Sequence, residues 1–496
     1  MQDTNSNNSD PFFDARIFLE GMIECLRTQK WLHAEHGEVE QLIHKDGFEL
    51  MRRLLQAHLN ERAEQEPQFA SVYHDGHEHN QKRQVCTRHL SSLFGAVVVP
   101  RKSYSVVGTD SIFPQDGALN LSPDQYSDGL RREIAFTVSE QSFDKSSKSI
   151  LRTTAGIVPK RQVGNVTRHL SQDFDEFYSC SSIEVNDDSS LLVLSCDGKG
   201  IVMRQSDLRP ITKKAAAAAQ QKKQTRLSRG EKGNRKRMAT AASVYDVEPH
   251  IRSAASIMGR EEKNSPAPRP SNKRAWASVE KSSLRVIEEM FAEALRRDPN
   301  QKRKWVVVVD GQPAQLKQIR TVMKKQKIKA TIVVDFIHVL EYLWKAAYCF
   351  SDETSQEAED WVMKRAHKIL AGEASQVAAG IRRSCTKRNL NSQQRKNADL
   401  CSDYLLKKKA YLGYDNCLAE GYPIASGVIE GTCRYLIQDR MDITGARWGL
   451  QGAEAVLKLR AIIINNDFEE YFRFHKSKEQ NRNYPFYKKI AYKMAA

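Results

Sequence analysis

Three acidic residues of this sequence are placed where carboxylates could act on a phosphodiester bond. Asp197 follows the apolar run in "LLVLSCD", Asp310 ends "KWVVVVD", and Glu430 lies in "SGVIEG". Two divalent ions held close together can activate an attacking oxygen and stabilise a leaving one, and Mg²⁺ requires oxygen ligands. Such a site needs two or three carboxylates that converge without neutralising partners. Acidic residues at strand ends are also common on solvated surfaces, so these positions by themselves are only suggestive.

A fourth acidic residue competes with Asp310 for the second position. The run "ATIVVD" ends on Asp335, which opens the element "DFIH" with His338. His338 could contact a phosphate or hydrogen-bond Asp335, and it could equally fill the core at the start of an apolar helix. Both apolar runs predict buried strands that deliver a carboxylate to a sheet edge.

The elements that would hold these residues form an α/β pattern. We expect a first strand that ends at Asp197, a tight turn through Gly198 and Gly200, and a second strand. "RMATAASVYDVEPH" predicts a third strand, and "SSLRVIEEMFAEALRR" predicts a helix capped near Ser282. The two strands that end on aspartates follow, each with a helix after it. This order predicts a mixed sheet of the ribonuclease-H-like kind, in which the first and fourth strands are neighbours.

The chain before this sheet predicts helices and a hairpin. Two helices span Pro11 to about Asn60, with Gly37 between them. The segment "YHDGHEHNQKRQ" has three histidines but no cysteine pair or acidic partner at a metal-site spacing, so we expect a solvated loop. A short hairpin with its turn at Pro100 follows.

Helices between Tyr126 and Tyr178 include a helix-turn-helix pattern. "TTAGIVPKRQVGNVTRHL" predicts a helix, a turn at Gly156 to Pro159 and a second helix. A basic second helix could enter a major groove, although plain three-helix bundles show the same pattern. The basic residues of this second helix are Lys160, Arg161, Arg168 and His169.

The charge of the chain indicates a polyanionic partner. The 496 residues carry a net charge of +16, with pI near 9.3, and nucleic acid is the commonest partner of such proteins. Between Ile201 and Thr240 stand twelve Lys or Arg and two acidic residues, which favours phosphate contacts over a merely solvated surface. The candidate DNA contacts in this part of the chain are Lys199, Arg229, Lys232, Arg235, Lys236 and Arg237.

The composition is typical of folded domains inside a cell. Hydrophobic residues make up 40% and charged residues 28% of the chain, as in ordinary globular proteins. No apolar run approaches the roughly 18 residues of a membrane span, and the N-terminus lacks a secretory pattern. The nine cysteines contain no CxxC pair, so we expect reduced thiols and neither a zinc ribbon nor disulfides.

Several longer segments resemble one family of enzymes. "SCDGKGIVMR", "VVVVDGQ", "IVVDFIHVLEYLWKAA" and the block "SGVIEG…RMDITGARW" are similar to those of the Kra-type insertion-sequence transposases, a Mutator-like branch of the DDE transposases. The resemblance runs from about Leu121 to the C-terminus. It implies a ribonuclease-H-like core in a cytoplasmic prokaryotic protein, where Asp197, Asp310 and Glu430 bind two Mg²⁺ or Mn²⁺ ions. Asp335 and His338 would form a supporting DxxH element.

The last block contributes further candidates. Arg434 lies four residues after Glu430 and could hold DNA or pair with that carboxylate on the helix surface. Trp448, with Arg440 and Arg447, could pack against a flipped base or a hairpin end. The alternative for Trp448 is a buried side chain that anchors the helices.

The sequence thus predicts a DNA transposase that cuts the ends of its element and joins the freed 3′-hydroxyl to target DNA. Its partners would be double-stranded DNA and other copies of itself, with no membrane. The alternatives are a ribonuclease-H-like structure-selective nuclease and a catalytically silent, transposase-derived DNA-binding protein. The expected regions are a helical region 1–70, a DNA-binding region 71–180, a first core part 181–350 with a basic insertion 206–237, a helical insertion 351–420 that would grip flanking DNA, last core helices 421–470 and a basic tail 471–496.

Overall fold

The computed structural model describes residues 10–182, 189–219, 223, 233–259, 266–443 and 445–487. The chain divides into two compact units. The first comprises Met1–Cys180 and Asn466–Ala496, and the second comprises Ser181–Asn465. The candidate DNA contacts Arg229 and Lys232 lie outside the described residues.

The second unit contains a five-stranded mixed sheet, which confirms the expected mixed α/β class. Its strands are β5 (Leu191–Val202), β6 (Lys236–Val247), β7 (Ser271–Ser278), β8 (Trp305–Val309) and β9 (Thr331–Val334). The order across the sheet is β7-β6-β5-β8-β9. Strands β7, β6 and β5 pair antiparallel, whereas β5, β8 and β9 pair parallel. The central strand β5 therefore joins an antiparallel half to a parallel half.

Two of the strand predictions are wrong. The predicted turn at Gly198 and Gly200 does not form, because β5 continues through both glycines and pairs residue by residue with β6. A Cβ atom at Gly200 would lie 2.9 Å from the Lys236 side chain, so this glycine permits close approach of the paired strand. The third strand of the sheet is instead β7. Only the second half of β7 is buried, and its polar first half gives no strand pattern.

Helices follow the strands as predicted. Helix α11 (Ser283–Arg297) begins at the expected cap, where the Ser282 hydroxyl accepts a hydrogen bond from the backbone N–H of Arg285. Helix α12 (Pro313–Gln326) follows β8, and α13 (Phe336–Ala347) follows β9. The other helices of this unit are α9 (Pro210–Ala218), α10 (Ala254–Ile257), α14 (Gln356–Leu370), α15 (Ala374–Lys387), α16 (Lys396–Lys408), α17 (Tyr414–Ala419), α18 (Gly427–Thr432), α19 (Asp439–Met441) and α20 (Leu450–Ile464), with a π-helical segment η3 (Cys433–Gln438) between α18 and α19.

The helical region after α13 shares its core with the sheet. Val193, Val306 and Val308 of the strands belong to the same buried cluster as Val339 of α13 and Ala398 of α16. Burial of these side chains removes apolar surface from water on both partners at once. Helices α14 to α17 therefore extend the core that packs on the sheet.

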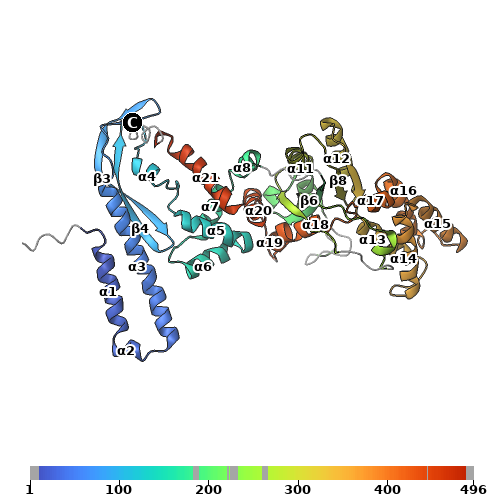
Figure 1. Ribbon diagram of the computed structural model, residues 1–496, viewed down its shortest axis with the longest axis horizontal. Helices are drawn as coiled ribbons and strands as arrows, with labels where there is room; N and C mark the ends of the chain where they lie inside the picture. The colour runs from blue at the N-terminus through green and yellow to red at the C-terminus, as the bar shows by residue number, and fades with distance from the viewer. Residues whose placement is uncertain are drawn as a thin grey trace, which may run out of the picture. The chain divides into compact units, whose positions relative to one another are not determined.

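The first unit is built on a long helix and a β-hairpin. Helix α1 (Phe13–Leu26) and the short α2 (Gln29–Leu32) precede α3 (His36–Glu64), which lies along the hairpin of β3 (Gln81–Ser92) and β4 (Gly95–Ser105) (Figure 1). The Gln56 amide fixes this packing, because it donates to the Val98 carbonyl and accepts from the Val98 N–H, both at 2.8 Å. Two predicted helices and the predicted hairpin are thus confirmed, with α2 as an additional short turn.

Two turns in this unit lie elsewhere than predicted. Gly37 is inside α3, and the break comes before it, where the Glu38 carboxylate accepts a 3.3 Å hydrogen bond from the Glu35 N–H. Pro100 lies inside β4 opposite Thr87, since a proline is tolerated in a two-stranded hairpin whose outer edges need no partner.

The histidine-rich segment is also not a loop. It forms a second small hairpin of β1 (Val72–His74) and β2 (His77–His79). Asp75 and Gly76 connect these strands with φ of 50° and 81°. Positive φ at both central residues is what the tight type I′ hairpin turn requires, and the dipeptide Asp-Gly supplies it.

Helices α5 (Asp128–Glu140), α6 (Phe143–Thr153) and α7 (Lys160–Leu170) pack on one another and confirm the predicted helix, turn and helix. The unit also contains α4 (Pro114–Ala118), α8 (Phe174–Cys180) and α21 (Phe468–Asn483). Buried Arg131 of α5 fastens α21 by donating to both carboxylate oxygens of Glu479, at 2.8 and 3.1 Å. Among the described helices of the chain, none combines the length and the apolar character needed to cross a membrane.

Candidate functional site

Asp197 and Asp310 lie next to each other where β5 and β8 part. These strands pair in parallel as far as Ser195 and Val308, and each aspartate stands two residues beyond that pair. Neighbouring strands are about 5 Å apart, so this register places the two aspartates side by side. Because side chains alternate across a sheet, both carboxylates lie on the face whose valines pack against α13.

These two carboxylates have no positive partner. Within the described ranges, no lysine or arginine forms an ion pair with either of them, and Asp197 accepts only from the Gly198 N–H at 2.5 Å and the Cys433 thiol at 3.4 Å. Burial, followed by the negative charge of Asp197, raises the pKa of Asp310 above its ordinary value. Two adjacent acids without a cationic partner form a donor set that suits a hard divalent cation such as Mg²⁺ or Mn²⁺.

Asp335 has a different environment, although it too ends a strand. It is completely buried, and its carboxylate caps α13 by accepting from the Ile337 N–H at 2.6 Å. The other oxygen accepts from both the N–H and the hydroxyl of Ser426, the residue before α18. Protein donors therefore occupy the Asp335 carboxylate, which ties the start of α13 to the start of α18.

Helix α18 places Glu430 beside Asp335. The Ser426 hydroxyl lies 3.2 Å from the Glu430 carboxylate, and ligand atoms of Asp335, His338 and Glu430 all lie within 4.8 Å of one another. No group of the described residues that could hold a metal joins Glu430 to Asp197 and Asp310. The predicted triad is therefore divided between two adjoining groups. His338 belongs to the Asp335 group and also lines the cleft that contains Asp310.

A π-helical segment joins the two groups along the chain. Helix α18 continues directly into η3, whose first residue Cys433 contacts Asp197 three residues after Glu430. Burial and the neighbouring Asp197 raise the pKa of the Cys433 thiol, so it remains a donor to the carboxylate. Single π-helical turns within helices occur frequently at functional sites.

Asp310 faces a cleft of about 700 Å³, which is within the size range of ligand sites. Its lining includes His338 and Tyr342 of α13 and Tyr404 of α16. The Tyr404 hydroxyl donates to the Asp310 carbonyl at 3.3 Å, and its ring stacks on Tyr342 with the centroids 4.0 Å apart. The helical region therefore contributes a wall of the cleft beside the candidate catalytic aspartate.

Several predicted DNA contacts lie on the surface. The helix α7 residues Lys160, Arg161 and Arg168 are exposed on one helix, whereas His169 turns inward to Arg131. In the second unit, Arg434 is exposed, and no ion pair with Glu430 occurs in the described part of the chain. The other predicted contacts that the structure describes as exposed or half-buried are Lys199, Arg235, Lys236 and Arg447.

Three other predicted DNA contacts are engaged inside the protein. The Arg237 guanidinium donates to three backbone carbonyls at 2.8 to 3.2 Å. Trp448 is only 7% exposed, and the buried Arg440 guanidinium lies over its ring at 4.7 Å from the centroid. This arrangement favours the alternative of a tryptophan that anchors the helices.

Sequence reasoning missed two residues that touch the candidate ligands. Ser426 contacts both Asp335 and Glu430, and Cys433 contacts Asp197. Their spacing contained a usable signal, since residues three and four positions from Glu430 share its side of a helix.

A second group of metal-ligand type lies in the first unit. His169, His475 and Glu479 have ligand atoms within 4.8 Å of one another. Arg131 is bonded to both oxygens of that glutamate and places a buried positive charge beside it, while Asp173 is bonded to His475 at 2.6 Å. Within this internal polar network, Arg131 already supplies a positive charge beside Glu479.

Neither a protein-family model nor a curated protein sequence matches this chain.

Proposed function

We propose that the protein is a DNA transposase whose chemistry is carried out by Asp197, Asp310 and Glu430. The observation that carries this proposal is the pair of in-register aspartates, which adjoin on parallel strands and have no positive partner among the described residues. In chain order, the sheet runs third, second, first, fourth, fifth. This order supports a ribonuclease-H-like core, together with the motifs that resemble Kra-type transposases.

The donor set fits divalent cations, which when bound would supply a Lewis acid for phosphodiester attack. Asp197 and Asp310 would hold them at the sheet, and Glu430 would complete the set by turning from the Asp335 group toward the aspartates. Ser426 and Cys433 orient these ligands through the hydrogen bonds described above. Water would be the nucleophile for cleavage, and a DNA 3′-hydroxyl the nucleophile for joining, so no serine or tyrosine intermediate is needed.

Asp335 would act as a positioning residue. Its carboxylate fixes the entry of α13, which carries His338 into the cleft, and the start of α18, which carries Glu430. The basic face of α7 would hold DNA by phosphate contacts in the first unit, with strong dependence on salt.

The test is a pair of assays with Mg²⁺ or Mn²⁺: cleavage of intact element-end DNA, and strand transfer of pre-cleaved element-end DNA into target DNA. Asp197→Asn, Asp310→Asn and Glu430→Gln should each lower cleavage and joining by about a thousandfold while DNA binding is retained. Glu341→Gln, which removes an acid lining the same cleft, is the control and should keep near-normal rates. Cleavage without joined products would replace the transposase by a nuclease. Binding without cleavage by the natural protein would replace it by a silent DNA-binding protein.

A further inference from the structure

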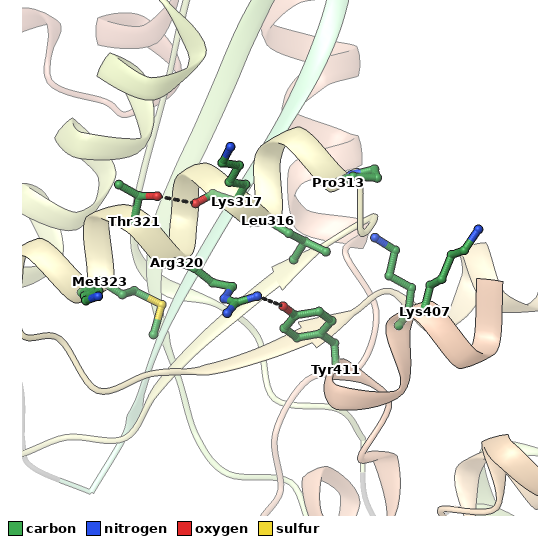
Figure 2. Close-up of a pocket in the computed structure, with 10 residues that line it drawn as sticks. Pro313, Leu316, Lys317, Arg320, Thr321, Met323, Lys407 and Tyr411 are labelled. Atoms are coloured by element: carbon green, nitrogen blue, oxygen red, sulfur yellow. Dashed lines mark hydrogen bonds between the residues drawn. The ribbon is translucent and has the colours of Figure 1, made fainter. Parts of the chain in front are cut away.

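A groove with only positive charges runs between α12 and α16. It has a volume of about 610 Å³ and contains no acidic residue in its lining. Figure 2 shows Lys317, Arg320 and Met323 of α12 on one side and Lys407 and Tyr411 on the other, with Arg320 reaching across to the Tyr411 hydroxyl. The positively charged lining residues are Lys317, Arg320, Lys324, Lys407 and Lys408.

The α12 cations of this groove are not committed to partners. Lys317, Arg320 and Lys324 stand at spacings of three and four residues, which puts them on one side of the helix. None of them forms an ion pair within the described ranges, and Arg320 makes one long hydrogen bond, 3.4 Å to the Tyr411 hydroxyl. Ordinary protein surfaces intersperse both signs of charge, so a groove lined by cations alone indicates an anionic ligand.

Lys408 gives an independent indication. Only 8% of its surface is exposed, and no carboxylate of the described residues pairs with it. Burial lowers the pKa of this ammonium, since taking a charge out of water is unfavourable without a counter-charge. An anion bound in the groove would supply that counter-charge.

The groove leads to the candidate catalytic cleft. Pro313, Lys407 and Lys408 line both the groove and the cleft that contains Asp310. From Lys317 to Lys324 the helix rises by about 10 Å, and successive phosphates of one DNA strand are about 3.4 Å apart along the duplex axis. Because the strand winds around that axis, its phosphates are farther apart along its own path, so about two of them could face this row while the strand continues to Asp310.

We propose that the groove between α12 and α16 binds the phosphate backbone of the DNA strand that enters the Asp310 cleft. The proposal rests on the proposed function for the identity of the strand, but the groove can be tested without catalysis. The DNA-binding residues that it assigns belong to α12 and α16, and they are not among the basic residues near 160 and 235 that the sequence predicted.

The experiment measures binding of a fluorescein-labelled random-sequence DNA duplex by anisotropy at several salt concentrations, without divalent metal. A variant with Lys317→Gln, Arg320→Gln and Lys324→Gln is compared with one carrying Lys325→Gln, Lys327→Gln and Lys329→Gln. The second set removes the same charge from exposed lysines outside the groove. The groove variant should bind about 10- to 100-fold more weakly at low salt and reduce the slope of log K against log salt by about two to three. The control should change the slope by less than one.

Lys408→Met is the second variant, because it keeps the length of the buried stem and removes its charge. It should reduce the salt slope by about one while the melting temperature stays constant or rises. Salt slopes equal to those of the control set for both variants would overturn the proposal. The proposal would also be overturned if the groove variant lost binding only to an RNA duplex of the same sequence and not to DNA. It would likewise be overturned if inorganic phosphate displaced the DNA far better than chloride at equal ionic strength, since this indicates a site for a lone phosphate.

Failure of this proposal is distinguishable from failure of the proposed function. If the natural protein cleaves and joins DNA but the groove variant binds like its control, the groove assignment fails and the transposase stands. If the groove variant loses DNA binding but the natural protein shows no metal-dependent cleavage, the groove stands and the transposase fails.

Discussion

Replacing Asp310, a half-buried residue of the candidate active site, by asparagine should stabilise the metal-free protein. Asp310 and Asp197 adjoin across β5 and β8 as like charges. Two unit charges about 5 Å apart repel by about 3 kcal/mol at an effective dielectric constant of 20. Because both side chains are partly exposed, solvent and salt reduce this to about 1 kcal/mol. Asp310→Asn removes the repulsion with almost no change of volume.

The assay is thermal unfolding in EDTA and in Mn²⁺ or Mg²⁺. In EDTA, Asp310→Asn should raise the melting temperature by roughly 2 °C, the shift that about 1 kcal/mol produces in a unit of this size. For the natural protein, adding metal at about 100 times its dissociation constant should add about 2.7 kcal/mol of stability. The variant should lose most of that gain.

Asp335→Asn is the matched comparison, since Asp335 also ends a strand. It should lower stability by about 2 to 3 kcal/mol with or without metal, because its charged carboxylate accepts from two backbone N–H groups and a serine hydroxyl. The reasoning would be refuted if Asp310→Asn destabilised the protein in EDTA, or if metal stabilised that variant as much as the natural protein. If metal still stabilised Asp310→Asn but did not stabilise a folded Asp335→Asn, Asp335 would be the metal ligand and Asp310 the positioning residue.

The first unit yields two further predictions. Arg131→Met should destabilise this unit by about 3 to 5 kcal/mol in chemical denaturation, because it removes the arginine that pairs with the buried Glu479 carboxylate. The double variant with Glu479→Gln should recover much of that loss, and no recovery would argue against the pair. Burial and then the charge of Arg131 lower the pKa of His169 in the folded protein. As the pH falls, His169 is therefore protonated in the unfolded chain before it is protonated in the folded protein. Stability should therefore fall as the pH drops below about 6.5. In His169→Gln the urea midpoint should change less with pH between pH 7.5 and roughly 5.5, and a pH dependence equal to that of the natural protein would contradict this.

The parts of the fold that sequence could predict are those with uninterrupted local patterns. The apolar runs before Asp310 and Asp335 identify β8, which is buried along its whole length, and β9, whose last two residues are buried. Strand β7 escapes prediction because its first half is polar and not buried, which leaves only a short apolar stretch. Glycines between two apolar runs are typical of a turn, but they also occur in a strand that a neighbouring strand approaches closely. The sequence around Gly198 and Gly200 does not distinguish these two cases.

The sequence could predict which acidic residues belong to the candidate site, but not which of them lie close to one another. Strand ends and one helix locate Asp197, Asp310 and Glu430, yet no local pattern reports that Ser426 fastens Asp335 and contacts Glu430. These hydrogen bonds join residues that are distant in sequence and depend on how α18 is packed. The groove of α12 and α16 has the same character, because its five cations come from two segments whose own sequences resemble ordinary helix surfaces.

The unbroken course of β5 gives the two sheet aspartates unequal freedom. Asp197 is anchored by backbone pairing to β6 both before and after it, whereas Asp310 stands just past the end of β8 and precedes Gly311, which has φ of 82°. If the two aspartates hold divalent ions as proposed, Asp197 would be the ligand that the sheet fixes on both sides. Adjustment to ions of different radius would then fall on Asp310 and the residues after it.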